Sequence, residues 1–245
     1  MSFRSRTVAA LAASVASLLG ASLAQAQAWR YPSFQQPRVA SREFNFAVAD
    51  GGDLAGTSVL AQWREGMGMR SQLSLDVGVA DGDYTNSYFL LGGQFGHQLL
   101  TASQSMPLDL MLTAGANVAI GDPFSLVRIP VGLSVGHQFP IESGMAITPF
   151  AHPRITYDRC GDCGATGNAE SDLGVDFDLG VDFRFTQQLS VRLATTLGGT
   201  EFFDGYYDAF GRRHSGSALG LSLAWTPRGH TATAPAPTAR PRTRR

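Results

Sequence analysis

The stretch LGVDFDLGVDFRF, residues 173–185, alternates strictly between two classes of residue. Its odd positions are leucine, valine or phenylalanine, and its even positions are glycine, aspartate or arginine. A period of two predicts a β-strand with one apolar and one polar face. At about 3.3 Å per residue this strand would be about 40 Å long, whereas a globular strand has about 5–6 residues. A tilted strand needs about 9–11 residues to cross a bilayer, so the stretch is typical of a membrane-spanning β-barrel.

The same alternation recurs about ten times along the chain. The expected strands cover 44–48, 59–63, 73–79, 89–99, 108–120, 128–135, 145–156, 173–185, 189–197 and 219–225. The fold class is therefore all-β: a transmembrane up-and-down antiparallel β-barrel of about ten strands with disordered termini. Pro149 and Pro153 predict a bulge or a locally unpaired edge, because proline removes a ladder hydrogen bond. The non-membrane alternative is a soluble barrel of the lipocalin type, which would bury its apolar residues inside.

Four segments are expected along the chain. Residues 1–28 are typical of a signal peptide, because two arginines precede a short apolar run and a small-x-small cleavage site. A transmembrane anchor is the alternative, but the apolar run is short for a membrane span. Residues 29–42 form a periplasmic lead-in, which is either extended or a small plug. Residues 43–226 form the outer-membrane barrel, and 227–245 form a tail rich in Arg, Pro, Ala and Thr that is predicted to be disordered.

Loop lengths give an independent test of the barrel. The second, fourth, sixth and eighth connections are short, whereas the odd connections include the two longest, 158–172 and 198–215. Long loops on one side and tight turns on the other are typical of outer-membrane barrels. An even number of strands then places both ends of the barrel on the periplasmic side.

The net charge of −1 hides an asymmetry. All 19 basic residues are arginine; two lie in residues 1–28 and five follow Trp225, which leaves twelve against 20 acidic residues. An acidic body argues against nucleic acid as a partner.

The cleavable leader, the strands and the segment Ile147-Thr148-Pro149-Phe150-Ala151 resemble the small outer-membrane β-barrel proteins of Gram-negative bacteria, in the OmpA-like or porin-like group. The resemblance covers roughly 43–225. It implies a place in the outer membrane, with membrane lipid as a partner, and assembly by the barrel-insertion machinery. Barrels of this group usually end at an aromatic residue that this machinery reads, whereas here Trp225 is followed by the tail.

The polar faces of the strands carry a set of charges expected to point into the lumen. These are Arg64, Asp76, Asp109, Arg128, Arg154, Asp176, Asp178, Asp182, Arg184 and Arg192. Opposite charges in a narrow bore should pair, because an unpaired buried charge is costly. The turn 186–188 and the alternation together predict that Asp182 lies opposite Arg192. A selective pathway for a small polar solute is the alternative to a structural ion-pair network.

Cys160 and Cys163 lie in an expected outer loop, where an oxidising compartment favours a disulfide between them. Two cysteines supply only half of a zinc site. The same region offers oxygen ligands that would suit calcium, but their spacing matches no calcium-loop pattern. These residues are Asp158, Asp162, Asn168, Glu170 and Asp172.

The expected outer rim is acidic. A solvated acidic surface is one interpretation, and contact with lipopolysaccharide phosphates through divalent cations is the other. Its members are Asp50, Asp53, Asp81, Asp83, Asp122, Asp158, Asp162, Glu170, Asp172, Glu201, Asp204 and Asp208, against Arg159, Arg212 and Arg213. An omptin-like hydrolase could use rim carboxylates with His214 to activate water, but no omptin motif surrounds that histidine.

The sequence favours a structural, adhesive or weakly pore-forming barrel without catalysis, cofactor or metal. A narrow channel for small polar solutes is the second interpretation, and an outer-rim hydrolase is the third.

Overall fold

The computed structural model describes residues 31–51, 56–82, 85–121, 125–141, 144–161, 169–199 and 217–227. Its strands are β1 (Arg42–Asp50), β2 (Thr57–Met67), β3 (Ser71–Gly82), β4 (Thr85–Leu100), β5 (Asp109–Ile120), β6 (Ser125–Gly136), β7 (Phe139–Pro140), β8 (Ala146–Gly161), β9 (Glu170–Arg184), β10 (Leu189–Gly199) and β11 (Ser217–Trp225). In this part of the chain, no helix is long and apolar enough to span a membrane.

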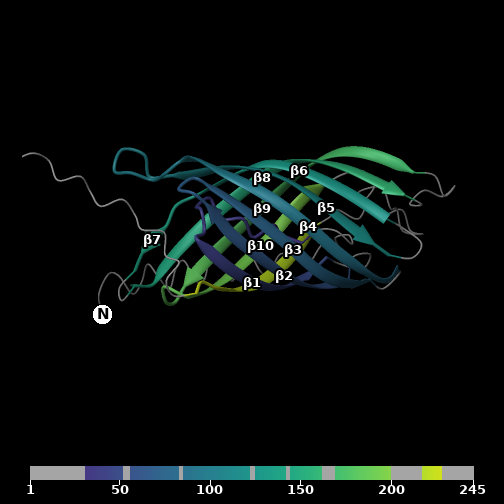
Figure 1. The fold of residues 1–245 in the computed structure, drawn as a ribbon, viewed down its shortest axis with the longest axis horizontal. Helices are drawn as coiled ribbons and strands as arrows, with labels where there is room; N and C mark the ends of the chain where they lie inside the picture. Colours follow the sequence, from purple (N-terminus) through teal and green to yellow (C-terminus); the bar gives the residue numbers. More distant parts are fainter. Residues whose placement is uncertain are drawn as a thin grey trace, which may run out of the picture.

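The strands form one closed antiparallel barrel. Each long strand pairs with the next long strand along the chain, and β1 pairs with β11 to complete the ring. The two-residue β7 adds only a short pairing with the start of β8, so β6 pairs directly with β8. Figure 1 shows the strands crossing the long axis of the barrel obliquely. The predicted up-and-down barrel of about ten strands is confirmed.

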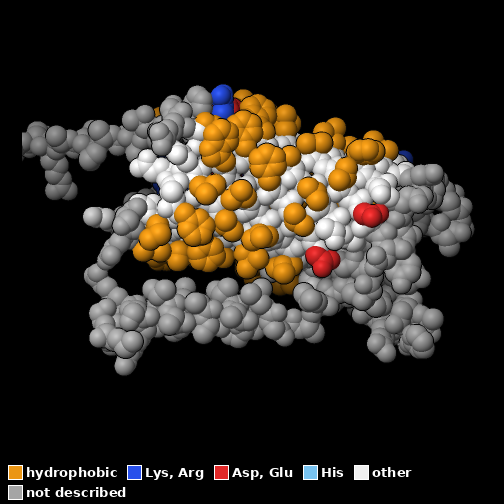
Figure 2. Space-filling view, turned by 90° about the horizontal axis from the view of Figure 1, so that it is seen from below, with side chains coloured by type: hydrophobic (Ala, Val, Ile, Leu, Met, Phe, Trp, Pro, Cys, Tyr) orange, Lys and Arg blue, Asp and Glu red, His pale blue; other side chains and the backbone are white. Residues whose placement is uncertain are grey.

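Apolar side chains cover the outside of the barrel, whereas most of the buried side chains inside are polar or charged. A smaller apolar cluster, which includes Leu60, Leu90 and Phe150, lies among them. In β9, Leu173 and Val175 are 67% and 61% exposed, whereas Asp176 and Asp178 are 0% exposed. Figure 2 shows hydrophobic side chains spread over the outer surface. This polarity is the reverse of the lipocalin alternative and suits a barrel surrounded by lipid.

Strand β8 runs through both of its prolines. Pro149 pairs with Val181 and Pro153 with Phe177 on the β9 side. On the β6 side the pairing is interrupted around Pro153, between the pairs Gly132↔Arg154 and Val135↔Ala151, with no change of register. The expected locally unpaired edge is therefore confirmed, because the proline nitrogen has no hydrogen to donate.

Both ends of the barrel lie at one mouth. We call it the terminal mouth: it holds the start of β1, the end of β11 and the connections 68–70, 101–108, 137–145 and 185–188. The opposite end, which carries the connections after β1, β3, β5, β8 and β10, is the loop mouth. The expectation that the tight turns and the two ends share one side is confirmed.

The predicted outer loop 158–172 includes residues that belong to strands in the structure. Strands β8 and β9 continue to pair as far as Cys160↔Glu170. The alternation of side chains persists through this region, with Asp158 buried and Arg159 exposed, so the ladder continues. Only 162–168 of the predicted loop lie outside the described residues.

The described part of the lead-in lies inside the barrel. Phe34 is 3% exposed and Gln35 is 0% exposed, although neither belongs to a strand. Of the two forms expected for the lead-in, the structure has the plug. We use this name for residues 32–37, all of which are buried. The barrel itself runs from Arg42 to Trp225, and the expected signal peptide and most of the tail lie outside the described residues.

Candidate functional site

Wall side chains bind the backbone of the lead-in. Arg64 on β2 donates from Nη2 to the carbonyl oxygen of Phe34 at 2.7 Å. Ser134 on β6 donates from Oγ to the carbonyl oxygen of Gln35 at 2.6 Å. Because the lead-in belongs to no sheet, its buried carbonyls need such partners. These two bonds attach the plug to β2 and β6, which lie nearly opposite each other in the ring of strands.

Two further contacts seat the plug. Ser33 Oγ lies 2.7 Å from Nδ1 of His152, whose Nε2 lies 2.8 Å from Thr113 Oγ1. The ring of Phe34 lies against Gly220 on β11, where an added Cβ would fall 2.6 Å from the ring's Cζ. Only glycine leaves room for the plug's aromatic ring at that position.

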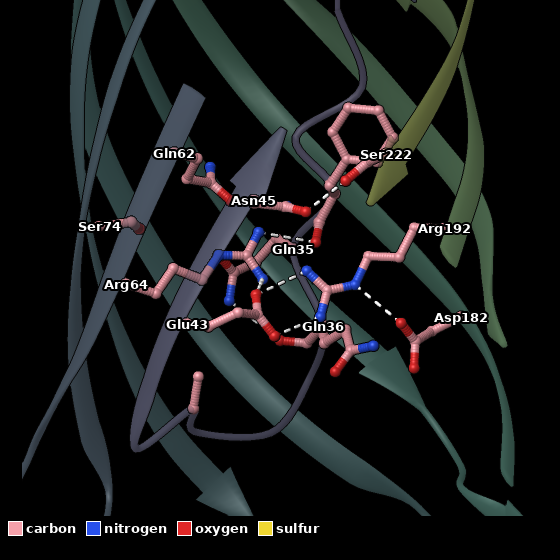
Figure 3. Close-up of polar contacts among 12 residues, drawn as sticks. Gln35, Gln36, Glu43, Asn45, Gln62, Arg64, Ser74, Asp182, Arg192 and Ser222 are labelled. Atoms are coloured by element: carbon pink, nitrogen blue, oxygen red, sulfur yellow. Dashed lines mark hydrogen bonds and ion pairs between the residues drawn. The ribbon is translucent and has the colours of Figure 1, made fainter. Parts of the chain in front are cut away.

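Four charged residues form the first ion-pair group, which we call the shared-carboxylate cluster: Glu43, Arg64, Asp182 and Arg192 (Figure 3). Arg192 donates to both carboxylate oxygens of Glu43, at 2.7 and 2.5 Å, and from Nε to Asp182 at 2.9 Å. Arg64 Nη1 lies 3.3 Å from the same Glu43. The predicted register is confirmed, because Asp182 pairs with Arg192 and Phe183 with Val191.

A second group, the cross-strand cluster, joins Arg128, Arg154, Asp158, Asp176 and Asp178. Arg128 donates to both carboxylate oxygens of Asp158, at 2.8 and 2.6 Å. Arg154 donates to Asp178 at 3.0 Å, and its Nε lies 3.7 Å from Asp176. All five residues are buried.

The other three expected lumen charges lie outside these clusters. Asp76 accepts a hydrogen bond from Gln62 at 2.6 Å. Asp109 accepts from the backbone N–H of Ala102 at 2.9 Å, at the terminal mouth. Arg184 is half-buried and makes no ion pair within the described part of the chain.

Three buried acidic or histidine side chains were not among the expected lumen charges: Glu43, His152 and Asp158, the last of which was placed on the outer rim. The signal that could have found them is parity. Glu43 shares the parity of Asn45 and Ala47 on β1, and His152 and Asp158 share that of Arg154 on β8. The rule that located Asp176 applies equally to these positions.

Most of the expected rim lies outside the described residues, including Asp83, Asp208 and His214. Asp81 lies at the loop mouth, where its carboxylate accepts a hydrogen bond from Ser87 at 3.2 Å. Cys160 is buried at the end of β8, and Cys163 falls beyond the described part, so their disulfide stays a prediction. Among the described residues, no group of three or more His, Cys, Asp or Glu side chains could hold a metal ion.

The lumen holds little free space near its middle. A cavity there measures about 30 Å³ and is lined by residues including Tyr31, Asp76, Arg128 and Arg154. That is room for only a few water molecules. A second cavity, of about 220 Å³, lies at the terminal mouth.

No protein-family model matches the sequence, and no curated protein matches it. The structural neighbours are outer-membrane β-barrel proteins. A bacterial polysaccharide outer membrane secretin has a TM-score of 0.43 and 9% identity, over 70% of this chain and 57% of that one. The NanC porin has a TM-score of 0.39 and 11% identity, over 76% of this chain and 100% of that one.

Outer membrane protein Omp33 of Acinetobacter baumannii has a TM-score of 0.35 and 11% identity, over 78% of this chain and 99% of that one. The comparison with the secretin covers only 57% of the secretin chain. Similarity at this level concerns the fold and says nothing about function.

Proposed function

We propose that this chain is an outer-membrane β-barrel whose lumen is closed by its own lead-in, with a structural or adhesive role and at most weak pore formation. The observation that carries the proposal is the plug. Residues 32–37 are buried in the lumen, and the arginine–carboxylate clusters fill the space beside them. A solute that crosses the lumen would have to pass these groups, and the lead-in would have to move aside for it.

The proposed orientation places the terminal mouth in the periplasm. An exported chain enters the outer membrane from that side, so both ends of the barrel should stay there. The apolar outer surface would then contact membrane lipid. Asp50 and Asp81, at the loop mouth, would face lipopolysaccharide, where divalent cations could bridge carboxylates and phosphates. A disulfide between Cys160 and Cys163 would close the loop after β8.

Planar-bilayer recording of the purified full-length chain tests the proposal. We expect very small conductance with rare openings, because the lead-in and the ion pairs block the bore. Large, steady, ion-selective steps would instead support the narrow channel. Outer-membrane fractionation and a heat-dependent shift in gel mobility check that the chain is a folded membrane barrel.

The proposal includes no catalysis. Peptide hydrolysis that disappears in the variant His214→Ala would instead support the outer-rim hydrolase. Absence of cleavage across a broad peptide panel is the expected result.

A further inference from the structure

The 220 Å³ cavity at the terminal mouth has the chemistry of an oxyanion site. Four arginines line it: Arg38, Arg64, Arg184 and Arg192. The lining contains a single carboxylate, that of Glu43. The walls of the cavity are therefore strongly cationic, in a molecule whose body is acidic.

The carboxylates around the cavity do not neutralise all four arginines. Arg64 and Arg192 share Glu43, and Arg192 also binds Asp182. Arg38 lies 3.7 Å from Asp109, and its side chain is 45% exposed. Arg184 has no ion pair within the described part of the chain. Among the four arginines of the cavity, Arg184 is therefore the one without a described carboxylate within ion-pair distance, although its charge also acts on Glu43.

Two buried N–H groups on the cavity lining also lack acceptors. Gln36 Nε2 and Arg64 Nε have no hydrogen-bond partner, although Gln36 is only 9% exposed and Arg64 1%. Figure 3 shows Gln36 beside Arg192 and Glu43. A buried donor without an acceptor lowers stability, so an acceptor bound in the cavity would recover this cost.

We propose that the terminal mouth binds a small oxyanion, of the phosphate type, between the Arg184 guanidinium and the Gln36 amide. The volume accommodates a hydrated oxyanion rather than a single water. The cavity opens between exposed residues of the mouth, including Gln187 and Arg38. Both free phosphate and the phosphodiester of a membrane lipid carry the required chemistry. The site does not depend on whether the barrel conducts.

Calorimetric titration of inorganic phosphate into the full-length chain tests the site, in a maltoside detergent that carries no phosphate. We expect saturable binding that weakens at least about tenfold in Arg184→Gln and several-fold in Gln36→Met, because each loses a donor to the anion. Arg159→Gln is the matched control, since it removes one exposed arginine near the loop mouth, and its affinity should stay within about twofold. Heat-dependent gel mobility confirms that each variant is folded.

Repeating the titration in phospholipid nanodiscs identifies the source of the anion. If lipid headgroups occupy the site, the heat of phosphate binding is measurable in maltoside and disappears in nanodiscs. If free solute is the ligand, phosphate binds with the same affinity in both. No saturable binding in maltoside, or equal affinity in Arg184→Gln and the parent chain, would overturn the proposal.

Discussion

The ion pairs of the two lumen clusters are of two kinds, and both clusters contain both kinds. In the cross-strand cluster, Arg128 and Asp158 lie directly opposite each other on the paired strands β6 and β8. In the shared-carboxylate cluster, Glu43 on β1 meets Arg192 on β10, although β11 lies between these strands. Strand register alone therefore forms the first kind of pair. The second kind exists only because the barrel closes and its side chains meet across the strand between them.

The largest expected effect comes from Arg192→Met in the shared-carboxylate cluster. This change leaves Glu43 without its two-point partner and Asp182 without its cation, both buried. We expect the free energy of unfolding to fall by about 3–5 kcal/mol. Urea titration in lipid vesicles, followed by tryptophan fluorescence, measures the change.

Arg184→Met is the matched control for this prediction. It removes an inward-facing arginine at the same mouth that has no ion pair in the described part of the chain, so it should change the free energy of unfolding by less than about 1 kcal/mol. Equal losses in the two variants would contradict the assigned role of Arg192.

Asp158→Leu should cost less, because Arg128 keeps Asp176 at 3.8 Å. We expect a loss of about 2–3 kcal/mol in the free energy of unfolding. The double variant Arg128→Met/Asp158→Leu should recover most of it, because neither charge of the pair remains and Asp176 keeps Arg154 at 3.7 Å. Urea titrations of the single and double variants measure this recovery.

The corresponding double variant of the other cluster sharpens the comparison. Glu43→Leu/Arg192→Met should recover little, since it leaves Arg64 without Glu43 and Asp182 without Arg192. Full recovery in both clusters would mean that the shared carboxylate has no special role.

Much of the barrel could be predicted from the sequence, because one face of each strand is apolar and the other polar. That period fixed the pairing of Asp182 with Arg192 through a short turn. It could not place Glu43 against Arg192, because they are 149 residues apart and no turn sets their distance. The plug was equally hidden, since the lead-in has no period, and its buried state depends on hydrogen bonds from the wall.

The smallest expected effect tests the contact between the plug and the wall. Ser33→Ala removes the hydroxyl that lies 2.7 Å from His152, and we expect a loss of about 1 kcal/mol in the free energy of unfolding. Ser87→Ala, at the exposed loop mouth, is the control and should be near neutral. Urea titration compares the two, and a neutral Ser33→Ala would mean that this hydrogen bond does not hold the plug.

The lead-in's place inside the lumen can be tested most directly by cysteine labelling. Gln35 is 0% exposed and Arg38 is exposed, although they are only three positions apart in the chain. A water-soluble maleimide, with the background of the parent chain subtracted, should label Arg38→Cys quickly in the folded protein. Gln35→Cys should stay protected until the protein is unfolded. Equally fast labelling of both cysteines in the folded barrel would show that the lead-in does not fill the lumen.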